Sequence, residues 1–191
     1  MGRVVAREQL KEQLDQERAN GARVVFTNGV FDLLHLGHLR YLRQARGLGD
    51  LLVVGVNSDA SARRLKGPAR PLVPEDERAE LLAALDCVDY VTIFDEATAE
   101  ATLALLKPDI YVKGADYATE AERQQDTLLD TGTLRQALAS DPSLGERLPE
   151  ARVAADYGGS LALLAYLPGH STSELIERIV ARYGPNEPAT E

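Results

Sequence analysis

The chain of 191 residues lacks the features that mark secreted and membrane-spanning proteins. Its single cysteine, Cys87, excludes an internal disulfide and lies in an apolar setting typical of a core residue. No apolar run approaches the roughly 18 residues that a membrane-spanning helix requires. The first residues also lack the hydrophobic segment of a signal peptide. These absences predict a cytoplasmic protein with no membrane partner.

The chain also has few basic residues: 21 lysines and arginines stand against 30 aspartates and glutamates, a formal net charge of -9. Proteins that bind nucleic acid usually present a basic face, so we expect no nucleic-acid partner. A cleft in an acidic protein can still be positive and attract a phosphorylated small molecule. Basic residues at positions 63, 64, 66, 70 and 78 supply such charge, although a solvated loop is the alternative interpretation.

Short β-branched runs alternate along the chain with amphipathic segments. We predict strands at 23–27, 51–56, 90–94, 110–112 and 160–166, helices at 6–20, 37–48, 97–106 and 173–183, and a further helix that opens at Pro74. The alternation is typical of right-handed βαβ units. It predicts an α/β fold, Rossmann-like, with three α/β/α layers around a parallel sheet of about five strands. We expect a single domain over residues 1–191.

The polar segment 119–147 interrupts the alternation between two core regions, 23–118 and 148–183. We predict short helices at 120–129 and 133–139 within it. A solvent-exposed insertion is the expected interpretation, and a lid or an oligomer contact is the alternative. We expect the tail, 184–191, to be frayed.

In a parallel sheet of this kind, ligands bind beyond the carboxyl ends of the strands. Three candidate segments, 28–38, 57–66 and 113–117, follow predicted strands and therefore meet at one edge. The first contains the tetrapeptide His35-Leu36-Gly37-His38, which places two imidazoles on one face of the helix that begins there. Two imidazoles and the free N–H groups of a helix start can bind one phosphate. For the histidine pair taken alone, a structural role is the alternative.

The run from Phe26 to His38, FTNGVFDLLHLGH, resembles the signature of the cytidylyltransferase-like nucleotidyltransferases. Within that superfamily the chain is similar to the heptose 1-phosphate adenylyltransferases. The motifs that carry this similarity are VNSD (56–59), RLKG (64–67), RP (70–71), ER (77–78), LAAL (82–85), VD (88–89), VKGADY (112–117), GG (158–159) and GHSTS (169–173). The chain departs from the family at Val30, where cysteine is frequent, and at Ala115, where glycine is frequent. Bifunctional members also carry a sugar kinase domain, so we expect a stand-alone transferase.

The resemblance implies a reaction in which a phosphate oxygen of the acceptor attacks the α-phosphorus of a nucleoside triphosphate and pyrophosphate leaves. Such a reaction needs positioning and charge neutralisation but no protein nucleophile. The family's catalytic roles carry over to His35 and His38, which bind the triphosphate, and to Lys66, a mobile cation. The expected cofactor is Mg²⁺, held by the triphosphate and water, so we predict no protein metal ligands.

The remaining site residues also follow from the resemblance. Those expected to bind the nucleotide are Thr27, Asn28, Gly29, Phe31, Gly37, Lys113, Gly114, Asp116, Ser171, Thr172 and Ser173. Asp116 would accept a ribose hydroxyl, whereas His170 is expected to lie beside the site. Asp32 and Arg78 are expected near the acceptor phosphate. The alternatives are a helix cap for Asp32, a surface ion pair with a glutamate for Arg78, and a plain N-cap for the hydroxyl cluster.

These motifs predict transfer of AMP from ATP to a sugar 1-phosphate, glycero-manno-heptose 1-phosphate above others, with release of pyrophosphate and an ADP-sugar. Other acceptors and donors stay open: CTP with glycerol 3-phosphate or a related polyol phosphate, and ATP with FMN. A non-catalytic nucleotide sensor or assembly protein is a further alternative. A class I aminoacyl-tRNA synthetase is excluded, because the chain is too short and too acidic for tRNA. We expect a homodimer on the general frequency of two-fold oligomers.

Overall fold

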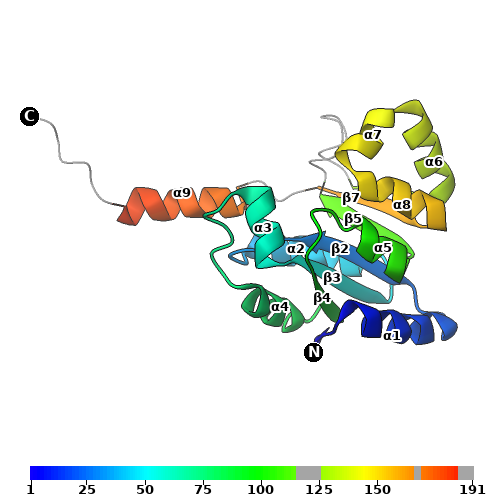
Figure 1. Cartoon of the computed structure of the whole chain (residues 1–191), viewed down its shortest axis with the longest axis horizontal. Coiled ribbons are helices and arrows are strands. Elements are labelled where there is room, and N and C mark those ends of the chain that lie inside the picture. Colours follow the sequence, from blue (N-terminus) through cyan, green and yellow to red (C-terminus); the bar gives the residue numbers. More distant parts are fainter. Residues whose placement is uncertain (115–125, 166–168, 185–191) are drawn as a thin grey trace, which may run out of the picture.

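The computed structural model describes residues 1–114, 126–165 and 169–184 (Figure 1). Its strands are β1 (Arg3–Val4), β2 (Val24–Gly29), β3 (Leu51–Asn57), β4 (Tyr90–Phe94), β5 (Ile110–Gly114), β6 (Thr127–Leu129) and β7 (Ser160–Leu164). Its helices are α1 (Arg7–Ala19), α2 (Leu36–Arg46), α3 (Asp59–Lys66), α4 (Glu75–Ala83), α5 (Glu100–Leu106), α6 (Thr131–Ser140), α7 (Pro142–Arg147), α8 (Pro149–Tyr157) and α9 (Thr172–Tyr183).

The described strands form one sheet in the order β1-β4-β3-β2-β5-β7-β6, and every neighbouring pair is parallel except β6 with β7. The predicted α/β class and parallel sheet are confirmed. The five predicted strands are β2, β3, β4, β5 and β7. The prediction missed β1 and β6, edge strands of two and three residues, because such short segments show no periodic pattern.

Strand β2 is the point at which the chain changes direction across the sheet. From β2 the chain builds β3 and β4 on one side, and it then returns to build β5 and β7 on the other. The carboxyl end of β2 is therefore a topological switch point, where open α/β sheets leave a crevice for ligands.

Two apolar cores lie on opposite faces of the sheet, because successive side chains of a strand point to opposite sides. Val24 and Phe26 of β2 pack with residues of α1, α5 and α8, whereas Val25 packs with residues of α2 and α4. Helices therefore cover both faces (Figure 1), which confirms the predicted three layers. Strand β3 is buried almost throughout, as expected for a strand covered on both sides.

The described part of the predicted solvent-exposed insertion, 126–147, has many exposed residues but also packs against the body of the fold. Strand β6 pairs with β7, and α6 and α7 both contact α8. Leu134 is fully buried and Leu144 nearly so. Residues 127–129 form a strand where we predicted helix, whereas the helix predicted at 133–139 is confirmed as α6. Helices α3, α7 and α8 were not predicted, although Pro142 and Pro149 open the last two, as proline often does.

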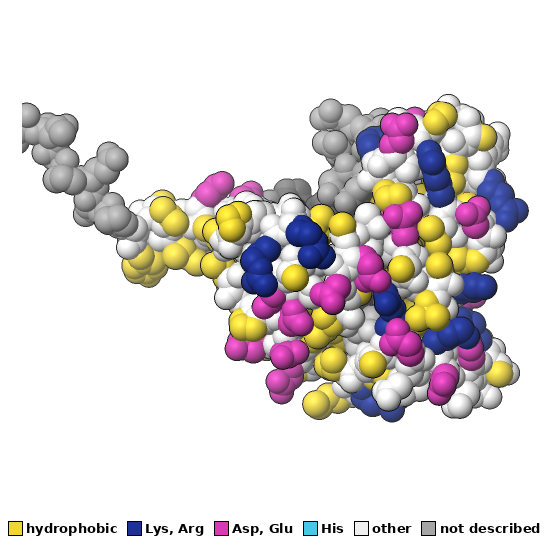
Figure 2. Space-filling view, viewed as in Figure 1, with side chains coloured by type: hydrophobic (Ala, Val, Ile, Leu, Met, Phe, Trp, Pro, Cys, Tyr) yellow, Lys and Arg dark blue, Asp and Glu magenta, His cyan; other side chains and the backbone are white. Residues whose placement is uncertain are grey.

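Helix α9 stands apart from the cores. It extends from the body of the protein (Figure 1), and its apolar side chains Ile179, Val180 and Tyr183 are exposed, as Figure 2 shows along its length. The predicted frayed tail lies outside the described residues beyond position 184. Across the described ranges, none of the helices has both the length and the apolar character needed to traverse a bilayer.

Burial of Leu134 gives the first testable prediction. Leu134→Ala removes fully buried side-chain atoms and should lower the free energy of unfolding by about 2–5 kcal/mol, as core truncations do. Urea denaturation followed by circular dichroism measures this. Leu128→Ala, at a side chain that is 52% exposed on β6, is the matched control and should change stability far less. Equal losses for the two variants would contradict the packing described.

Candidate active site

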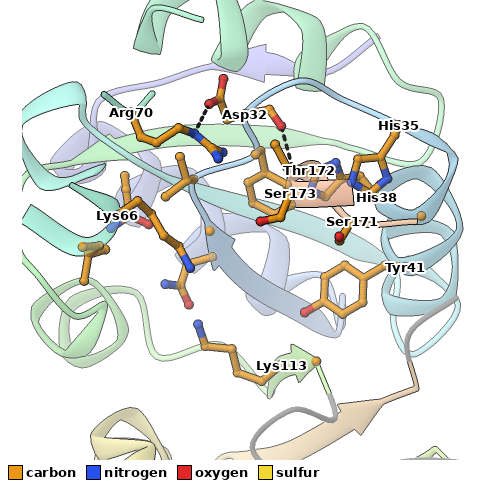
Figure 3. Close-up of a pocket in the computed structure, with 18 of the residues that line it drawn as sticks. Asp32, His35, His38, Tyr41, Lys66, Arg70, Lys113, Ser171, Thr172 and Ser173 are labelled. Atoms are coloured by element: carbon orange, nitrogen blue, oxygen red, sulfur yellow. Dashed lines mark hydrogen bonds and ion pairs between the residues drawn. The ribbon is translucent and has the colours of Figure 1, made fainter. Parts of the chain in front are cut away.

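A cavity of about 780 Å³ opens at the switch point of the sheet. Most of the predicted site residues line it: Asn28, Gly29, Phe31, Asp32, His35, Gly37, His38, Lys66, Lys113, Gly114, Ser171, Thr172 and Ser173. Figure 3 shows several of them converging on one hollow from α2, α3, β5 and α9. The structure thus brings together residues that lie more than a hundred positions apart in the sequence.

Two predicted nucleotide-binding residues are not among these. Thr27 is fully buried, and its hydroxyl donates to the carbonyl oxygen of Val112 at 3.0 Å and lies 2.7 Å from the Tyr41 hydroxyl. Its position supports a role in joining β2 to β5 rather than in binding nucleotide. Asp116 lies outside the described residues, so its expected contact with ribose stays a prediction.

The loop between β2 and α2 has an unusual backbone. Phe31 and Leu33 have φ angles of 51° and 49°, a left-handed conformation that is uncommon for residues other than glycine. Such strain persists only where surrounding contacts impose it, and it is concentrated at functional sites. The loop ends at His35, which is the N-cap residue of α2 and has extended backbone angles. This geometry places both imidazoles beside the free N–H groups of the first turn of α2.

The two imidazoles are stacked on each other. The ring centroids of His35 and His38 are 3.9 Å apart, and the Phe31 ring lies 5.5 Å from that of His38. Burial, together with the neighbouring His35, lowers the pKa of His38 to about 4. Burial and the nearby His170 lower the pKa of His35 as well. Both rings are therefore neutral at pH 7.

The Nδ1 atoms of His35 and His38 are buried and have no hydrogen-bond partner among the described residues. Buried polar atoms are nearly always paired in folded proteins, and those that are not call for an explanation such as a bound ligand. Two adjacent unsatisfied imidazoles at the start of a helix suit an anion that brings several acceptor oxygens.

The Asp32 carboxylate is buried and joins the histidine loop to residues 70–73. It accepts hydrogen bonds from Arg70 Nε at 2.8 Å, from the Leu72 amide at 2.9 Å and from the Val73 amide at 3.0 Å. Burial raises the pKa of Asp32, but these hydrogen bonds outweigh burial and leave the pKa below its usual value. An ionised carboxylate repels phosphate, so its position does not support the expected acceptor-phosphate role.

The alternative role for Asp32, a cap on α2, is wrong because His35 occupies the N-cap position. Asp32 instead orients Arg70, which the sequence analysis left out of the site. Arg70 lines the cavity, and Figure 3 shows its guanidinium facing inward beside Asp32. The signal for Arg70 was its place in the basic stretch that contains Lys66.

Arg78 does not reach the cavity, so the expected acceptor-phosphate role is not supported. Its side chain is 1% exposed and donates to the carbonyl oxygens of Val73, Val30 and Asn57. It also forms an ion pair with Asp59 at 2.7 Å. The surface pair with a glutamate, which was the alternative, is therefore wrong as well. Arg78 is an internal cross-link between four segments that surround the site.

Helix α9 is joined to the histidine loop at its N-terminus. The Ser171 hydroxyl accepts from the Glu174 amide at 3.1 Å, and the Glu174 carboxylate accepts from the Ser171 amide at 2.8 Å. This capping box fixes the first turn. The Thr172 hydroxyl donates to the carbonyl oxygen of Asp32 at 3.0 Å. The amide groups at the start of α9 thus face the same cavity as the imidazoles.

Gly37 allows this join to be tight. A Cβ atom at Gly37 would lie 2.8 Å from the carbonyl oxygen of His170 and 2.9 Å from His35 Cε1. Real Cβ atoms essentially never lie this close to backbone atoms. Helix α2 and the segment before α9 can therefore meet only because residue 37 has no side chain. His170, expected beside the site, does line the cavity.

Two lysines approach the cavity from different elements. Lys66 ends α3 and Lys113 lies in β5, and Figure 3 shows both amino groups directed into the hollow. Lys113 also lies over the Tyr111 ring, with Nζ 5.9 Å from its centroid. The Tyr111 hydroxyl donates to Asn28 Oδ1 at 2.9 Å, which leaves the Asn28 amide nitrogen as a donor. With Arg70, the two lysines bring three cationic side chains to the cavity wall, where the carboxylates of Asp32 and Glu174 also lie.

Further cavity residues were not predicted, among them Thr98, which follows β4, and Arg147 and Glu150 from α7 and α8. No motif marked them, and two come from helices that the sequence pattern did not reveal. Within the ranges the structure describes, no three carboxylate, imidazole or thiol groups cluster as they do around a metal ion held by protein. A divalent cation that enters with a triphosphate needs no such cluster, because phosphate oxygens and water can complete its shell.

The low pKa of His38 gives the second prediction. The unfolded chain takes up a proton near pH 6.5, whereas folded His38 does so only near pH 4. Stability is therefore lost as pH falls through this interval, by about 2 kcal/mol between pH 7 and pH 5. His38→Gln should remove this loss. Urea denaturation at a series of pH values measures the free energy of unfolding of the two proteins. If this free energy changes with pH in the same way in both, the pKa of His38 is not lowered.

Comparison with known proteins shows which family this chain resembles. The model of the cytidylyltransferase-like family matches residues 26–178. The bifunctional protein HldE of Syntrophotalea carbinolica is 49% identical over 177 residues, which is 93% of this chain and 31% of that protein. HldE of Trichlorobacter lovleyi is 48% identical over the same length, and HldE of Geobacter sulfurreducens is 47% identical over 168 residues. The chain spans about a third of the length of these relatives.

A solved structure, that of the lipopolysaccharide core biosynthesis protein from Thermoplasma volcanium, is similar over 55% of this chain and 84% of its own, with 37% identity and a TM-score of 0.47. The family match runs from within β2 into α9, so it includes the histidine loop, both lysines and the hydroxyl cluster. The chain belongs to the cytidylyltransferase-like family.

Proposed function

We propose that this chain transfers AMP from ATP to a sugar 1-phosphate, with glycero-manno-heptose 1-phosphate as the acceptor, and releases pyrophosphate and an ADP-sugar. The observation that carries the proposal is the meeting of the histidine pair, the start of α9 and the cations Lys66, Arg70 and Lys113 in one cavity. The order of the motifs, similar to that of heptose 1-phosphate adenylyltransferases, and the similarity to HldE over 93% of the chain support the choice of substrates.

The histidine pair and α9 would bind the triphosphate. Neutral His35 and His38 each donate one N–H, and the start of α9 adds backbone N–H groups and a positive helix dipole. A polyanion beside the rings raises their pKa, since a nearby negative charge favours the protonated form. The site therefore gains positive charge as the nucleotide enters, which stabilises both the bound triphosphate and the transition state.

The cations would then act on the phosphoryl transfer itself. An oxygen of the acceptor phosphate attacks the α-phosphorus, and the bond from that phosphorus to the oxygen that bridges to the β-phosphate breaks. Negative charge grows on the leaving pyrophosphate, where the imidazoles and Lys66 can neutralise it. Mg²⁺ bound to the nucleotide would supply further positive charge. No bond to the protein forms at any stage.

The side chain of Lys66 is less restrained than that of Arg70, and this difference supports different roles for the two residues. Lys66 is exposed, and its amino group has no hydrogen bond within the described part of the chain. A long unrestrained side chain at the end of α3 can follow the phosphates as they separate. Arg70 is held by the buried Asp32 carboxylate, so it offers its two terminal nitrogens in a fixed position. A fixed guanidinium suits the phosphate of the incoming acceptor.

A cross of donors and acceptors tests the substrates. ATP and CTP are each combined with heptose 1-phosphate, glycerol 3-phosphate and FMN, and pyrophosphate release and product mass are measured. We expect product from ATP with heptose 1-phosphate. Turnover of CTP with glycerol 3-phosphate, or of ATP with FMN, would favour a sibling activity instead. Absence of pyrophosphate with every pair would favour the non-catalytic nucleotide sensor.

Substitution of the catalytic groups tests the mechanism. His38→Gln and Lys66→Gln should each lower kcat by about 100-fold or more, the usual effect of losing one transition-state donor, with the fold intact by circular dichroism. Arg63→Gln is the matched control, because Arg63 is an exposed cation on α3 outside the cavity. An unchanged kcat in either variant would refute the role given to that residue.

A further inference from the structure

A second group of residues lines the same cavity and differs in side-chain type from the imidazoles and lysines. These residues are Thr98 and Ala97, which follow β4, and Arg147, Pro149 and Glu150 at the junction of α7 and α8. The phosphate-binding part is built from imidazoles, lysines and helix N-termini. This other part contains the buried carboxylate of Glu150, which has no ion pair among the described residues, whereas the buried Asp32 carboxylate is paired with Arg70. This difference favours a different chemical group here.

Glu150 is 5% exposed, and its carboxylate is held in place. Its Oε1 accepts a hydrogen bond from the Ala99 amide at 3.0 Å. Its Oε2 has no hydrogen-bond partner among the described residues, although the residue lines the cavity. The side chain stands in the first turn of α8, where the helix dipole favours a negative charge. The molecule thus keeps an acceptor oxygen fixed at the cavity wall.

An ionised carboxylate repels phosphates and accepts hydrogen bonds from hydroxyl groups. Its neighbours fit the same kind of ligand. The Thr98 hydroxyl donates to Glu100 at 2.7 Å, which leaves its oxygen as an acceptor. The Arg147 guanidinium, paired with Asp141 at 3.2 Å and half exposed, offers further N–H donors. A neutral group with several hydroxyls can pair with all three, whereas an apolar or anionic group cannot.

We propose that Thr98, Arg147 and Glu150 form the subsite for the sugar ring of the acceptor, and that Glu150 determines acceptor specificity by accepting hydrogen bonds from ring hydroxyls. This inference rests on the proposed function and extends it to the part of the site that selects the acceptor. The subsite joins the two halves of the fold, because Thr98 follows β4 and Glu150 belongs to the helix that precedes β7.

Glu150→Gln is a sharp test because glutamine keeps an oxygen for the Ala99 amide and replaces only the second oxygen. We expect the KM for heptose 1-phosphate to rise about tenfold or more, as when a charged hydrogen-bond partner is lost, with the KM for ATP within about twofold. Glu146→Gln, on the exposed side of α7 and outside the cavity, is the matched control. Thr98→Val should give a smaller rise in the same KM.

A second readout separates binding of the sugar from a structural role. Mannose 1-phosphate and its monodeoxy analogues are compared as acceptors with the wild type and with Glu150→Gln. The penalty of the substitution should disappear for the analogue that lacks the contacted hydroxyl, as in a double-mutant cycle. An equal penalty for every acceptor, an unchanged KM for the acceptor, or a rise in the KM for ATP alone would each overturn the inference. Failure of the wild type to form any ADP-sugar would overturn the proposed function instead.

Discussion

The site depends on the bonds that hold the histidine loop against the segment carrying Arg70. The buried Asp32 carboxylate draws that segment in from one side through two backbone amides and a guanidinium. Arg78 ties the same two segments from within, through the carbonyl oxygens of Val30 and Val73. Burying such charges is costly unless each finds several partners, and here both do. The result is a set of cavity-lining groups in fixed relative positions, and such positioning is most of what the proposed phosphoryl transfer asks of a protein.

Cationic side chains gather in the cavity, although the whole chain is acidic. The protein carries a net charge of -9, yet the part of the cavity proposed to bind phosphates is lined by Lys66, Arg70, Lys113 and the N-termini of α2 and α9. A cationic cleft within an acidic surface concentrates anions at one place and leaves the rest of the surface repellent to them. The low pKa values of the two imidazoles fit the proposed function, because a bound phosphate would raise them and the rings would gain their charge in the bound state.

The sequence predicted much of this structure where a local pattern existed. Short apolar runs located the five long strands, and the His-x-Gly-His spacing located the imidazole pair. Where tertiary contacts alone determine the role or burial of a residue, the sequence did not predict it. Arg78 resembles a surface cation until its four partners are in view, and Asp32 resembles a helix cap until Arg70 and the Leu72 amide meet it. Leu134 lies in a polar stretch, and its burial follows from the packing of α6 rather than from a local pattern. Glu150 has no motif around it, and its place in the cavity follows from the packing of α8.

The join between Gly37 and the segment before α9 has a consequence for how the protein comes to be active. The bond from Thr172 to the backbone of Asp32 spans 140 positions, so the cavity is closed by two stretches that lie far apart along the chain. During synthesis the central strands can pair early, but the cavity stays incomplete until the residues around Thr172 have been made. Contacts so distant along the chain also form slowly. Completion of the cavity therefore comes late in folding, after the central strands of the sheet have begun to assemble.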